Sequence, residues 1–332
     1  MHVRPTPMDG CMQSANMNIR SFLARTRRTA ARLMGAGARP SAPSDPMAEN
    51  RRILENQSEK AQAAGIDRLM VWLSFDCDTD RDAEAAERID PWLRERGIHG
   101  TYAVPGVQIE RSAENYRRLA AAGASFMNHG YQPHAEWRGD RYHPITFYDQ
   151  MAEADVVEDI RLGHEAVKRV VGIAPRGFRA PHFGSFQSPE QLALVHREAV
   201  RLGYFYSSTT VPQFGLDHGP MAQVGGLYEF ALSGSLRAPT LILDSWCHLE
   251  DRAQYRLADA YCEMLVETVE FMLSRNLPGL LSLYVDPAHV DKQAPFLRAM
   301  DFLHRKNIVS VRPEDLLPYD GSPRLVDTPV WN

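Results

Sequence analysis

Apolar runs of strand length alternate with longer amphipathic segments along most of the chain, and this alternation constrains the fold more than any other feature. The first run covers residues 69–75 and the last covers residues 308–311. Strands and helices that alternate in this way are typical of βα units arranged around a mainly parallel sheet. The sequence therefore predicts an α/β fold, a distorted (β/α) barrel of about seven strands.

The expected elements follow one another in chain order. Glycines such as Gly97 and Gly123 follow helical segments and mark the expected helix ends. Strands are expected at residues 69–75, 98–104, 124–127, 177–179, 204–206, 241–243, 280–285 and 308–311. Helices are expected at residues 82–96, 112–122, 147–171, 189–202, 255–275 and 293–306.

Composition divides the chain into four expected parts. Residues 1–46 carry recurring arginines among small residues and have few side chains able to build a core, so we expect a disordered tail. Residues 47–67 predict a lead-in helix, residues 68–318 the barrel domain, and residues 319–332 a C-terminal tail. The scarcity of acidic residues in the first part is compatible with a targeting segment, and a start at Met47 is an equal alternative.

Charge and cysteine content disfavour several classes of protein. The formal net charge of −5 provides no basic field for a phosphate backbone, so we expect no nucleic-acid partner. The four cysteines form no CxxC pair and are too scattered for a disulfide framework, which favours a reducing compartment. Because no apolar run approaches the roughly 20 residues of a membrane span, we expect a cytoplasmic protein. Its oligomeric state stays open.

Acidic, histidine and arginine side chains follow four of the expected strands. Catalytic groups of (β/α) barrels lie at the carboxyl ends of the strands, so this is where a site is expected. Singly, each residue has an ordinary explanation as a helix cap, a core residue or a surface residue. In strand order, the residues are Asp76, Asp78, His129, His134, Arg179, His182, Asp286 and His289.

The first two strand ends suggest a cation site. Asp76 and Asp78 are two residues apart, so in an extended segment both carboxylates point to the same side. His129 and His134 are candidate co-ligands because Gly130 between them allows the loop to turn. A carboxylate and two imidazoles leave coordination positions open, as in a catalytic zinc site or a similar divalent site. Solvent-exposed loop polarity remains the alternative explanation for the two histidines.

These residues resemble the polysaccharide deacetylases of the NodB-homology type, also called carbohydrate esterase family 4, over residues 69–318. The resemblance implies that Asp76 is the catalytic base and that Asp78, His129 and His134 bind one divalent ion, with zinc expected. Most members separate the two histidines by four residues rather than by the five found here. His143 is therefore an alternative ligand.

The resemblance also extends to the third and fourth motifs. Arg179 followed by Ala and Pro is similar to the family's arginine motif, which implies that it orients Asp76 and keeps it ionised. Pro181, His182 and Phe183 then become candidate substrate-binding residues. Trp246 is a candidate wall of the acetyl site, although a tryptophan at this place in the chain is equally expected in a core.

The final motif departs from the family pattern. The family places a histidine, often followed by proline, after the last strands as the general acid, whereas Asp286 and Pro287 occupy that place here. His289 follows three residues after Asp286 and is the expected acid. His248 is the alternative, and weakened catalysis by this route also stays open.

Together, these residues predict a hydrolase that removes an acetyl group from an N-acetylated sugar or sugar precursor by metal-activated water. Amide hydrolysis requires an activated water, a stabilised oxyanion and a proton for the leaving amine. An allantoinase-like hydrolase of a small cyclic amide and a non-catalytic carbohydrate-binding protein are the alternatives. The aromatic residues that can stack on a sugar or simply pack are Tyr131, Trp137, Tyr142, Trp246 and Tyr284.

Overall fold

The computed structural model describes residues 45–317 of the chain. The contacts discussed below lie within residues 49–317, which belong to the second of the two units into which the chain divides. The tails predicted at residues 1–46 and 319–332 fall outside the described residues, apart from residues 45 and 46. The domain boundaries at residues 68 and 318 therefore stay predictions.

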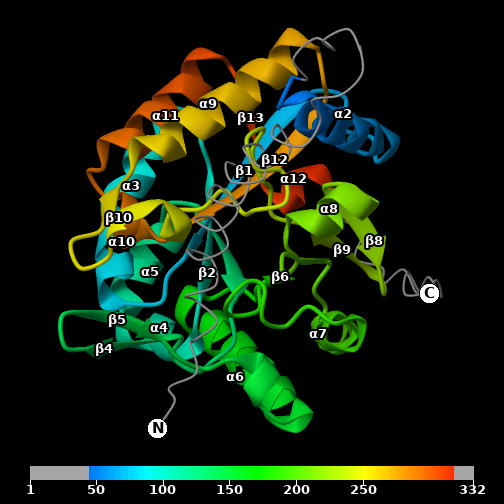
Figure 1. Ribbon diagram of the computed structural model, residues 1–332. Helices are drawn as coiled ribbons and strands as arrows, with labels where there is room; N and C mark the ends of the chain where they lie inside the picture. Colours follow the sequence, from blue (N-terminus) through cyan, green and yellow to red (C-terminus); the bar gives the residue numbers. More distant parts are fainter. Residues whose placement is uncertain (1–44, 318–332) are drawn as a thin grey trace, which may run out of the picture. The chain divides into compact units, whose positions relative to one another are not determined.

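A single large sheet forms the core of the second unit and curls as a half-barrel (Figure 1). Its strand order is β12-β1-β2-β3-β6-β7-β9-β8, with β13 pairing with β1 off this path. Neighbouring strands are parallel except for the antiparallel pair β8 and β9. The predicted α/β barrel-like fold class is confirmed. The bounds are β1 (Leu69–Asp76), β2 (Gly100–Val104), β3 (Ser125–Asn128), β6 (Gly177–Phe178), β7 (Tyr206–Ser207), β8 (Met221–Val224), β9 (Leu227–Phe230), β12 (Gly279–Val285) and β13 (Val309–Ser310).

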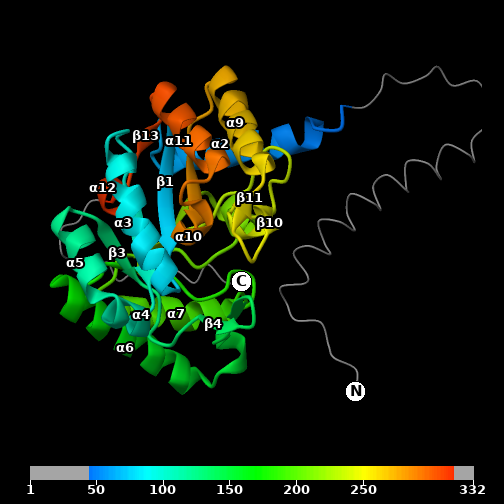
Figure 2. The same ribbon diagram turned by 90° about the vertical axis from the view of Figure 1, so that its left-hand side faces the viewer.

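Helices follow the strands around the outside of this sheet. Figure 2 shows α3, α5 and α6 following one another, and α9 packs against α11. No helix among residues 45–317 is long and apolar enough to cross a bilayer. The bounds are α2 (Ala48–Ala63), α3 (Asp80–Arg94), α4 (Gly106–Arg111), α5 (Ala113–Ala121), α6 (Glu153–Val171), α7 (Pro189–Arg201), α8 (Pro212–His218), α9 (Asp259–Ser274), α10 (Pro287–Val290), α11 (Ala294–Arg305) and α12 (Pro313–Leu316), with 3₁₀ turns at Tyr148–Gln150 and Trp246–His248.

Strand β1 places the polar site above an apolar interior. All eight of its residues are buried, as expected for a strand covered on both faces of a parallel sheet. Side chains two residues apart share a face, so Met70 and Trp72 lie on the same face as Ser74 and Asp76. The first two belong to a buried apolar cluster, whereas the last two are polar. One face of the strand thus changes from apolar to polar toward its carboxyl end.

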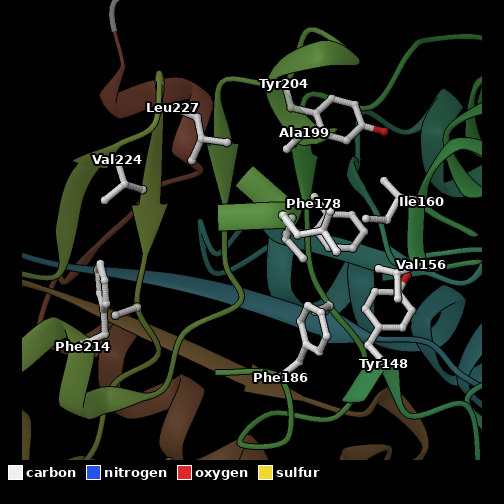
Figure 3. Packing of buried hydrophobic residues seen from close by; sticks show 14 residues of the cluster. Tyr148, Val156, Ile160, Phe178, Phe186, Ala199, Tyr204, Phe214, Val224 and Leu227 are labelled. Carbon is white, nitrogen blue, oxygen red and sulfur yellow. The ribbon is translucent and has the colours of Figure 1, made fainter. Parts of the chain in front are cut away.

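A second apolar cluster fixes α6 and α7 against the sheet (Figure 3). Val156 and Ile160 of α6 and Ala199 of α7 pack around Phe178 of β6 and the ring of Tyr148. Burying an aromatic or branched side chain of this size contributes about 1.5–3 kcal/mol. This packing sets the position of α6, which matters for the site because α6 contacts the loop that follows β3.

The strand expected at residues 241–243 is absent from the structure. Leu241 is 45% exposed, and the chain from residue 231 to residue 245 runs irregularly between the ends of the sheet. Ser233 donates its amide to the carbonyl of Ser282 on β12, and Asp244 forms an isolated parallel bridge with Tyr284. The nearby Pro239 cannot donate to a strand ladder, which favours a loop over a strand here.

Two short hairpins that the sequence analysis missed lie outside the main sheet. The first pairs β4 (Ala135–Arg138) with β5 (Arg141–Pro144), and the second pairs β10 (Leu249–Asp251) with β11 (Arg256–Leu257). The first hairpin has no buried residue and the second buries only Leu249 and Leu257, so the apolar periodicity gave no signal. The Gly139-Asp140 pair between β4 and β5 is a hairpin signal that could have revealed the first one.

Candidate metal centre

Arg179 lies completely buried directly after β6 and holds Asp76 at the end of β1. Its Nη1 donates to Asp76 Oδ1 at 2.6 Å. Its Nη2 donates to Ser74 Oγ at 2.8 Å and to Ser208 Oγ at 3.0 Å, and Nε donates to the Ser208 carbonyl at 3.3 Å. A buried guanidinium needs these partners because an unpaired charge in the interior is costly. The ion pair fixes one carboxylate oxygen of Asp76 and leaves the other available.

The protonation of Asp76 reflects two opposing effects. Burial raises the pKa of Asp76, while the charges of Arg179 and His129 lower it, and the pKa ends above its ordinary value. The sequence analysis expected Arg179 to keep this carboxylate ionised. The ion pair does act in that direction, but desolvation outweighs it in the protein alone. Asp76 is therefore a stronger base than an exposed carboxylate.

Asp78, His129 and His134 converge on one point beside Asp76. One ligand atom from each lies within 4.8 Å of the other two. Asp78 Oδ1 is 3.7 Å from His129 Nε2 and 3.3 Å from His134 Nδ1. Asp78 Oδ1 and both ring nitrogens of His134 are buried and have no hydrogen-bond partner. Buried polar atoms without partners are rare in folded proteins, and a cation between these three residues would satisfy them.

The two imidazoles are held in the form that binds metals. His129 Nδ1 lies 2.8 Å from the carbonyl oxygen of Arg179, so Nδ1 carries the proton and Nε2 presents its lone pair to Asp78. Burial and the neighbouring His134 lower the pKa of His129 to about 3. Burial also lowers the pKa of His134, and the charge of His182 lowers it further. Both rings are therefore neutral at physiological pH, as metal coordination requires.

Asp159 on α6 shapes the loop that separates the two histidines. Its carboxylate accepts hydrogen bonds from the amides of Tyr131 at 3.1 Å and Gln132 at 2.8 Å, and from the hydroxyl of Tyr148 at 2.7 Å. Gly130 adopts a φ of 76°, and a Cβ there would lie 2.3 Å from Asp159 Oδ2. The loop therefore wraps over Asp159, which fixes the segment between the two histidines. The sequence analysis missed Asp159, whose only signal is a carboxylate on the apolar face of a helix.

His143 does not join this group. It lies on β5 opposite Glu136 and is partly exposed. The three residues that converge are the ones expected from spacing and resemblance, and the alternative ligand His143 is not among them.

The geometry of this centre agrees with a comparison of the sequence with protein families. The family model described as polysaccharide deacetylase matches residues 65–204. The predicted resemblance to the polysaccharide deacetylases is confirmed over these residues. The match covers β1 to the end of α7 and includes Asp76, Asp78, both histidines and Arg179. A search of the curated proteins finds no match.

The structure is also similar to solved structures, and the first of the three that follow has a TM-score above 0.5, which indicates a shared fold. A proposed polysaccharide deacetylase from Mycobacterium smegmatis is 21% identical with a TM-score of 0.51, over 75% of this chain and 90% of that one. A family 4 carbohydrate esterase from Streptomyces lividans in complex with acetate is 16% identical with a TM-score of 0.47, over 74% and 92%. A polysaccharide deacetylase from Bacillus cereus is 12% identical with a TM-score of 0.46, over 76% and 96%.

His289 lies on α10, outside the residues that the family model matches. Its Nδ1 is 3.1 Å from Asp286 Oδ2 and 3.2 Å from Ser245 Oγ. Burial lowers the pKa of His289, but the contact with Asp286 and the charges of Asp82 and Asp244 together outweigh burial, and the pKa ends above its ordinary value. The ring therefore holds a proton more firmly than a free imidazole does. Burial and the charge of Asp286 together raise the pKa of Asp78 to about 7, against the opposing effects of His182 and His289. Asp286 and His289 therefore both lie within electrostatic reach of the candidate metal centre.

His248 is arranged differently from His289. Its Nδ1 lies 2.8 Å from the Asp244 carbonyl oxygen and its Nε2 lies 3.4 Å from the sulfur of Met264. Both ring nitrogens are thus occupied by neighbours, and burial lowers its pKa. Of the two histidines that the sequence left open as proton donors, His289 has the better environment.

Asp82 links the two halves of the site and was missed from the sequence. Its Oδ2 accepts hydrogen bonds from the amide of Thr79 at 2.9 Å and from its hydroxyl at 2.6 Å, which forms a capping box at the start of α3. Its Oδ1 accepts the amide of Ala288 at 3.0 Å. The turn that carries Asp78 is thereby joined to the helix that carries His289. The Thr-x-x-Asp pattern reveals the cap but not the second partner.

Residues 181–183 form a tight turn next to His134. Pro181 is buried, and His182 adopts a φ of 55°, which is uncommon for a residue with a side chain. His182 Nε2 lies 2.6 Å from the carbonyl oxygen of Ile145, and its ring centroid is 5.7 Å from that of His134. The predicted substrate-binding segment is therefore adjacent to the metal ligands.

The two aromatic residues predicted to bind substrate contact different parts of the site. Phe183 packs against Tyr284, with ring centroids 4.9 Å apart, and Arg179 lies 5.2 Å from its ring. Trp246 stacks on His289 at 5.3 Å with an interplanar angle of 30°. Its buried indole nitrogen has no hydrogen-bond partner. A tryptophan that serves only as core rarely leaves this donor unused.

Proposed function

We propose that this chain is a metal-dependent hydrolase that removes the acetyl group from an N-acetylated sugar or sugar precursor. One observation carries the proposal: the buried, partnerless atoms of Asp78 and His134 lie beside an ion-paired Asp76. Ligand atoms without partners favour a cation, and a second carboxylate next to them favours base catalysis.

Asp78, His129 and His134 would hold the ion. Zinc is the metal we propose, because catalytic zinc sites use three protein ligands of the histidine and carboxylate type. When bound, a divalent ion there would polarise the acetyl carbonyl and make a water molecule more acidic. The neutral rings of the two histidines and the carboxylate of Asp78 supply lone pairs without a competing hydrogen bond.

Asp76 is the proposed general base. Arg179 anchors its Oδ1, so the free Oδ2 is available to take a proton from the attacking water. Its raised pKa increases its affinity for that proton. The water oxygen then bonds to the acetyl carbon, and the backbone amides near His182 and Phe183 are candidate donors to the developing oxyanion.

His289 is the proposed general acid. The carbon–nitrogen bond breaks as the imidazolium gives its proton to the amine nitrogen, because an amide anion is too basic to leave. Asp286 and Ser245 contact its Nδ1, which leaves Nε2 for the substrate. Asp286 occupies the position where the family has its histidine. In this chain we propose that Asp286 instead positions the acid, His289, through their contact. Trp246, stacked on His289, would wall the acetyl group.

Metal analysis combined with a turnover screen tests the proposal. The protein is purified without chelators, its metal content is measured, and acetate release is followed from N-acetylglucosamine, from its nucleotide-linked form, and, as ring opening, from allantoin. We expect one divalent ion per chain and acetate release. Asp78→Ala should lose the ion, and Asp76→Asn should keep the ion but lose turnover.

Other outcomes separate the alternatives. Ring opening of allantoin without acetate release would indicate a hydrolase of small cyclic amides. Saccharide binding without turnover in the metal-loaded protein would indicate a non-catalytic carbohydrate-binding protein. Absence of a bound ion would refute the metal-dependent hydrolase in either form.

A further inference from the structure

Two arginines next to the candidate metal centre have no carboxylate partner. Arg81 is the second residue of α3, three positions after Asp78, and Arg252 follows β10. Among residues 45–317, neither guanidinium makes an ion pair or a hydrogen bond, whereas Arg138 and Arg256 on the two hairpins are paired with Glu136 and Glu250. An arginine that no carboxylate engages keeps its planar set of donors for a ligand.

Aromatic rings position Arg81. Its guanidinium carbon lies 4.9 Å from the ring centroid of Trp137, and 5.9 Å from those of Tyr142 and Tyr255. Trp137 is 45% exposed, so this arrangement lies at the surface. Stacking on aromatic faces orients a guanidinium without using its hydrogen-bond donors, which all lie in its plane.

The hairpin that carries two of these rings is fixed to the metal centre. Its far end returns to His134, whose carbonyl accepts the amide of Ile145 at 2.8 Å. Thr146 donates its hydroxyl to the carbonyl of Pro133 at 2.7 Å. Arg81 therefore stands between the turn that carries Asp78 and the hairpin that starts at His134.

Arg252 approaches the site from the other hairpin. Its guanidinium carbon lies 4.7 Å from the ring of Trp246, which in turn stacks on His289. The ring of Tyr255 lies 4.4 Å from that of His289 and also contacts Arg81. Each arginine is thus one aromatic ring away from the proposed proton donor.

The nearest carboxylates are engaged elsewhere. Asp80 Oδ1 accepts a hydrogen bond from Gln108, and Asp82 is used by Thr79 and Ala288 as described above. Asp251 Oδ1 accepts the backbone amides of residues 253 and 254. These carboxylates reduce the local positive potential but do not occupy the donors of either arginine.

We propose that the substrate carries an anionic group, a phosphate or a carboxylate, close to its acetamido group, and that Arg81 and Arg252 bind that group. This inference rests on the proposed deacetylase function and narrows its substrate class. Guanidinium groups bind phosphate and carboxylate through paired, charge-assisted hydrogen bonds. Trp137 offers an exposed face on which a sugar ring can lie next to the bound anion.

Equilibrium binding to the metal-loaded, full-length protein tests this inference. Calorimetric titration compares N-acetylglucosamine 6-phosphate, the carboxylate-bearing N-acetylmuramic acid and neutral N-acetylglucosamine. We expect at least one anionic sugar to bind about tenfold or more tightly than the neutral one, with a gap that narrows as salt rises. The phosphate and carboxylate titrations show which anion is the better ligand.

Substitutions assign the preference to the two arginines. Arg81→Gln and Arg252→Gln should each reduce the anionic preference about fivefold to tenfold and leave neutral-sugar binding unchanged. Arg138→Gln and Arg256→Gln, on the two neighbouring hairpins, each remove one positive charge that is already paired with a glutamate, and should change nothing. Arg81→Lys should restore only part of the preference, since an ammonium lacks the planar donor pair.

The outcomes for this inference and for the proposed function are distinguishable. Equal binding of neutral and anionic sugars, no detectable binding of any of them, or a preference unchanged in both glutamine variants, overturns the anionic substrate. Acetate release from neutral sugars would still support the deacetylase in that case. Conversely, anion binding that depends on Arg81 in a protein without turnover would retain the anion site and refute the deacetylase.

Discussion

Two buried clusters of carboxylate and histidine in this protein differ in how completely their hydrogen bonds are satisfied. Glu229 on β9 accepts the amides of Thr209 at 2.7 Å and Thr210 at 2.9 Å, the Thr210 hydroxyl at 3.0 Å, and contacts His196 Nε2 at 2.9 Å. In the metal centre, by contrast, Oδ1 of Asp78 has no hydrogen-bond partner. Both clusters combine a carboxylate with histidine, but the side chain of Glu229 is fully buried whereas that of Asp78 is 18% exposed.

The protonation of the two carboxylates follows from this difference. Burial raises the pKa of Glu229, but the hydrogen bonds and charge of His196 outweigh burial, and the pKa ends below its usual value. Burial, followed by the charge of Asp286, raises the pKa of Asp78 to about 7. A carboxylate whose lone pairs are filled by the fold stabilises the fold, whereas one left unfilled is prepared for a ligand.

Replacing Asp78 with alanine should have the largest effect. We expect loss of the bound ion and a decrease in kcat/KM of about 1,000-fold or more, since the ion and its activated water are lost together. Without metal, the free energy of unfolding should not fall, because a desolvated, unpartnered carboxylate is removed. Metal analysis and urea unfolding of the chelator-treated protein measure both. A large loss of stability would remove the distinction between the clusters.

Replacing Glu229 with glutamine should produce the opposite pattern. The free energy of unfolding should fall by about 3 kcal/mol or more, because several buried donors lose a charged acceptor. Metal content and the kcat of the folded protein should stay unchanged. Glu136→Gln, which removes an exposed carboxylate, is the control, with an expected change of about 0–1 kcal/mol. Loss of the ion in the Glu229 variant would show that the clusters are coupled.

The Asp286–His289 pair sharpens the comparison because it is hydrogen-bonded, as in the Glu229 cluster, yet lies next to the metal centre. His289→Gln should lower kcat by about 100-fold to 1,000-fold with the ion retained. Because the pKa of His289 is raised, its acid form persists to higher pH than that of a free imidazole and declines as pH rises through that pKa. The alkaline limb of the pH–rate profile should disappear in the variant. His248→Gln should preserve both rate and profile.

The smallest expected effect is the pH dependence of the Glu229 contribution. Because the folded pKa lies below that of the unfolded chain, about 4.3, the contribution is complete at neutral pH and is lost as pH falls through the folded value. The stability difference between the protein and Glu229→Gln should therefore narrow below about pH 4. Denaturant titrations across this range measure it, and a constant difference would mean that Glu229 acts through shape alone.

The sequence predicted the parts of the fold and of the site that are local in the chain. Long buried runs such as β1 carry a continuous apolar signal, and the strand ends that follow them carry the residues that the fold brings together at the metal centre. Their roles as ligands, base and acid stay predictions. Spacing alone identified Asp76 and Asp78 because two residues on one strand face need no knowledge of the rest of the chain.

Features that depend on distant partners could not be predicted. Asp82 meets Ala288, and Asp159 meets the loop after β3, only once the helices have packed. Similarly, the run at residues 241–243 is as apolar as a short strand, but no neighbouring strand among the described residues pairs with it through backbone hydrogen bonds. Periodicity describes the faces of an element and contains no information on which remote side chain will complete a hydrogen bond.

The carboxylate of Asp159 under the histidine loop has a consequence for how such a chain can change. Shortening the loop by one residue would deprive that carboxylate of its amides, and removing the carboxylate would leave the amides of Tyr131 and Gln132 without an acceptor. Each single change would therefore leave hydrogen-bonding groups without partners, which lowers stability. Loop length and the residue at position 159 are thus energetically coupled.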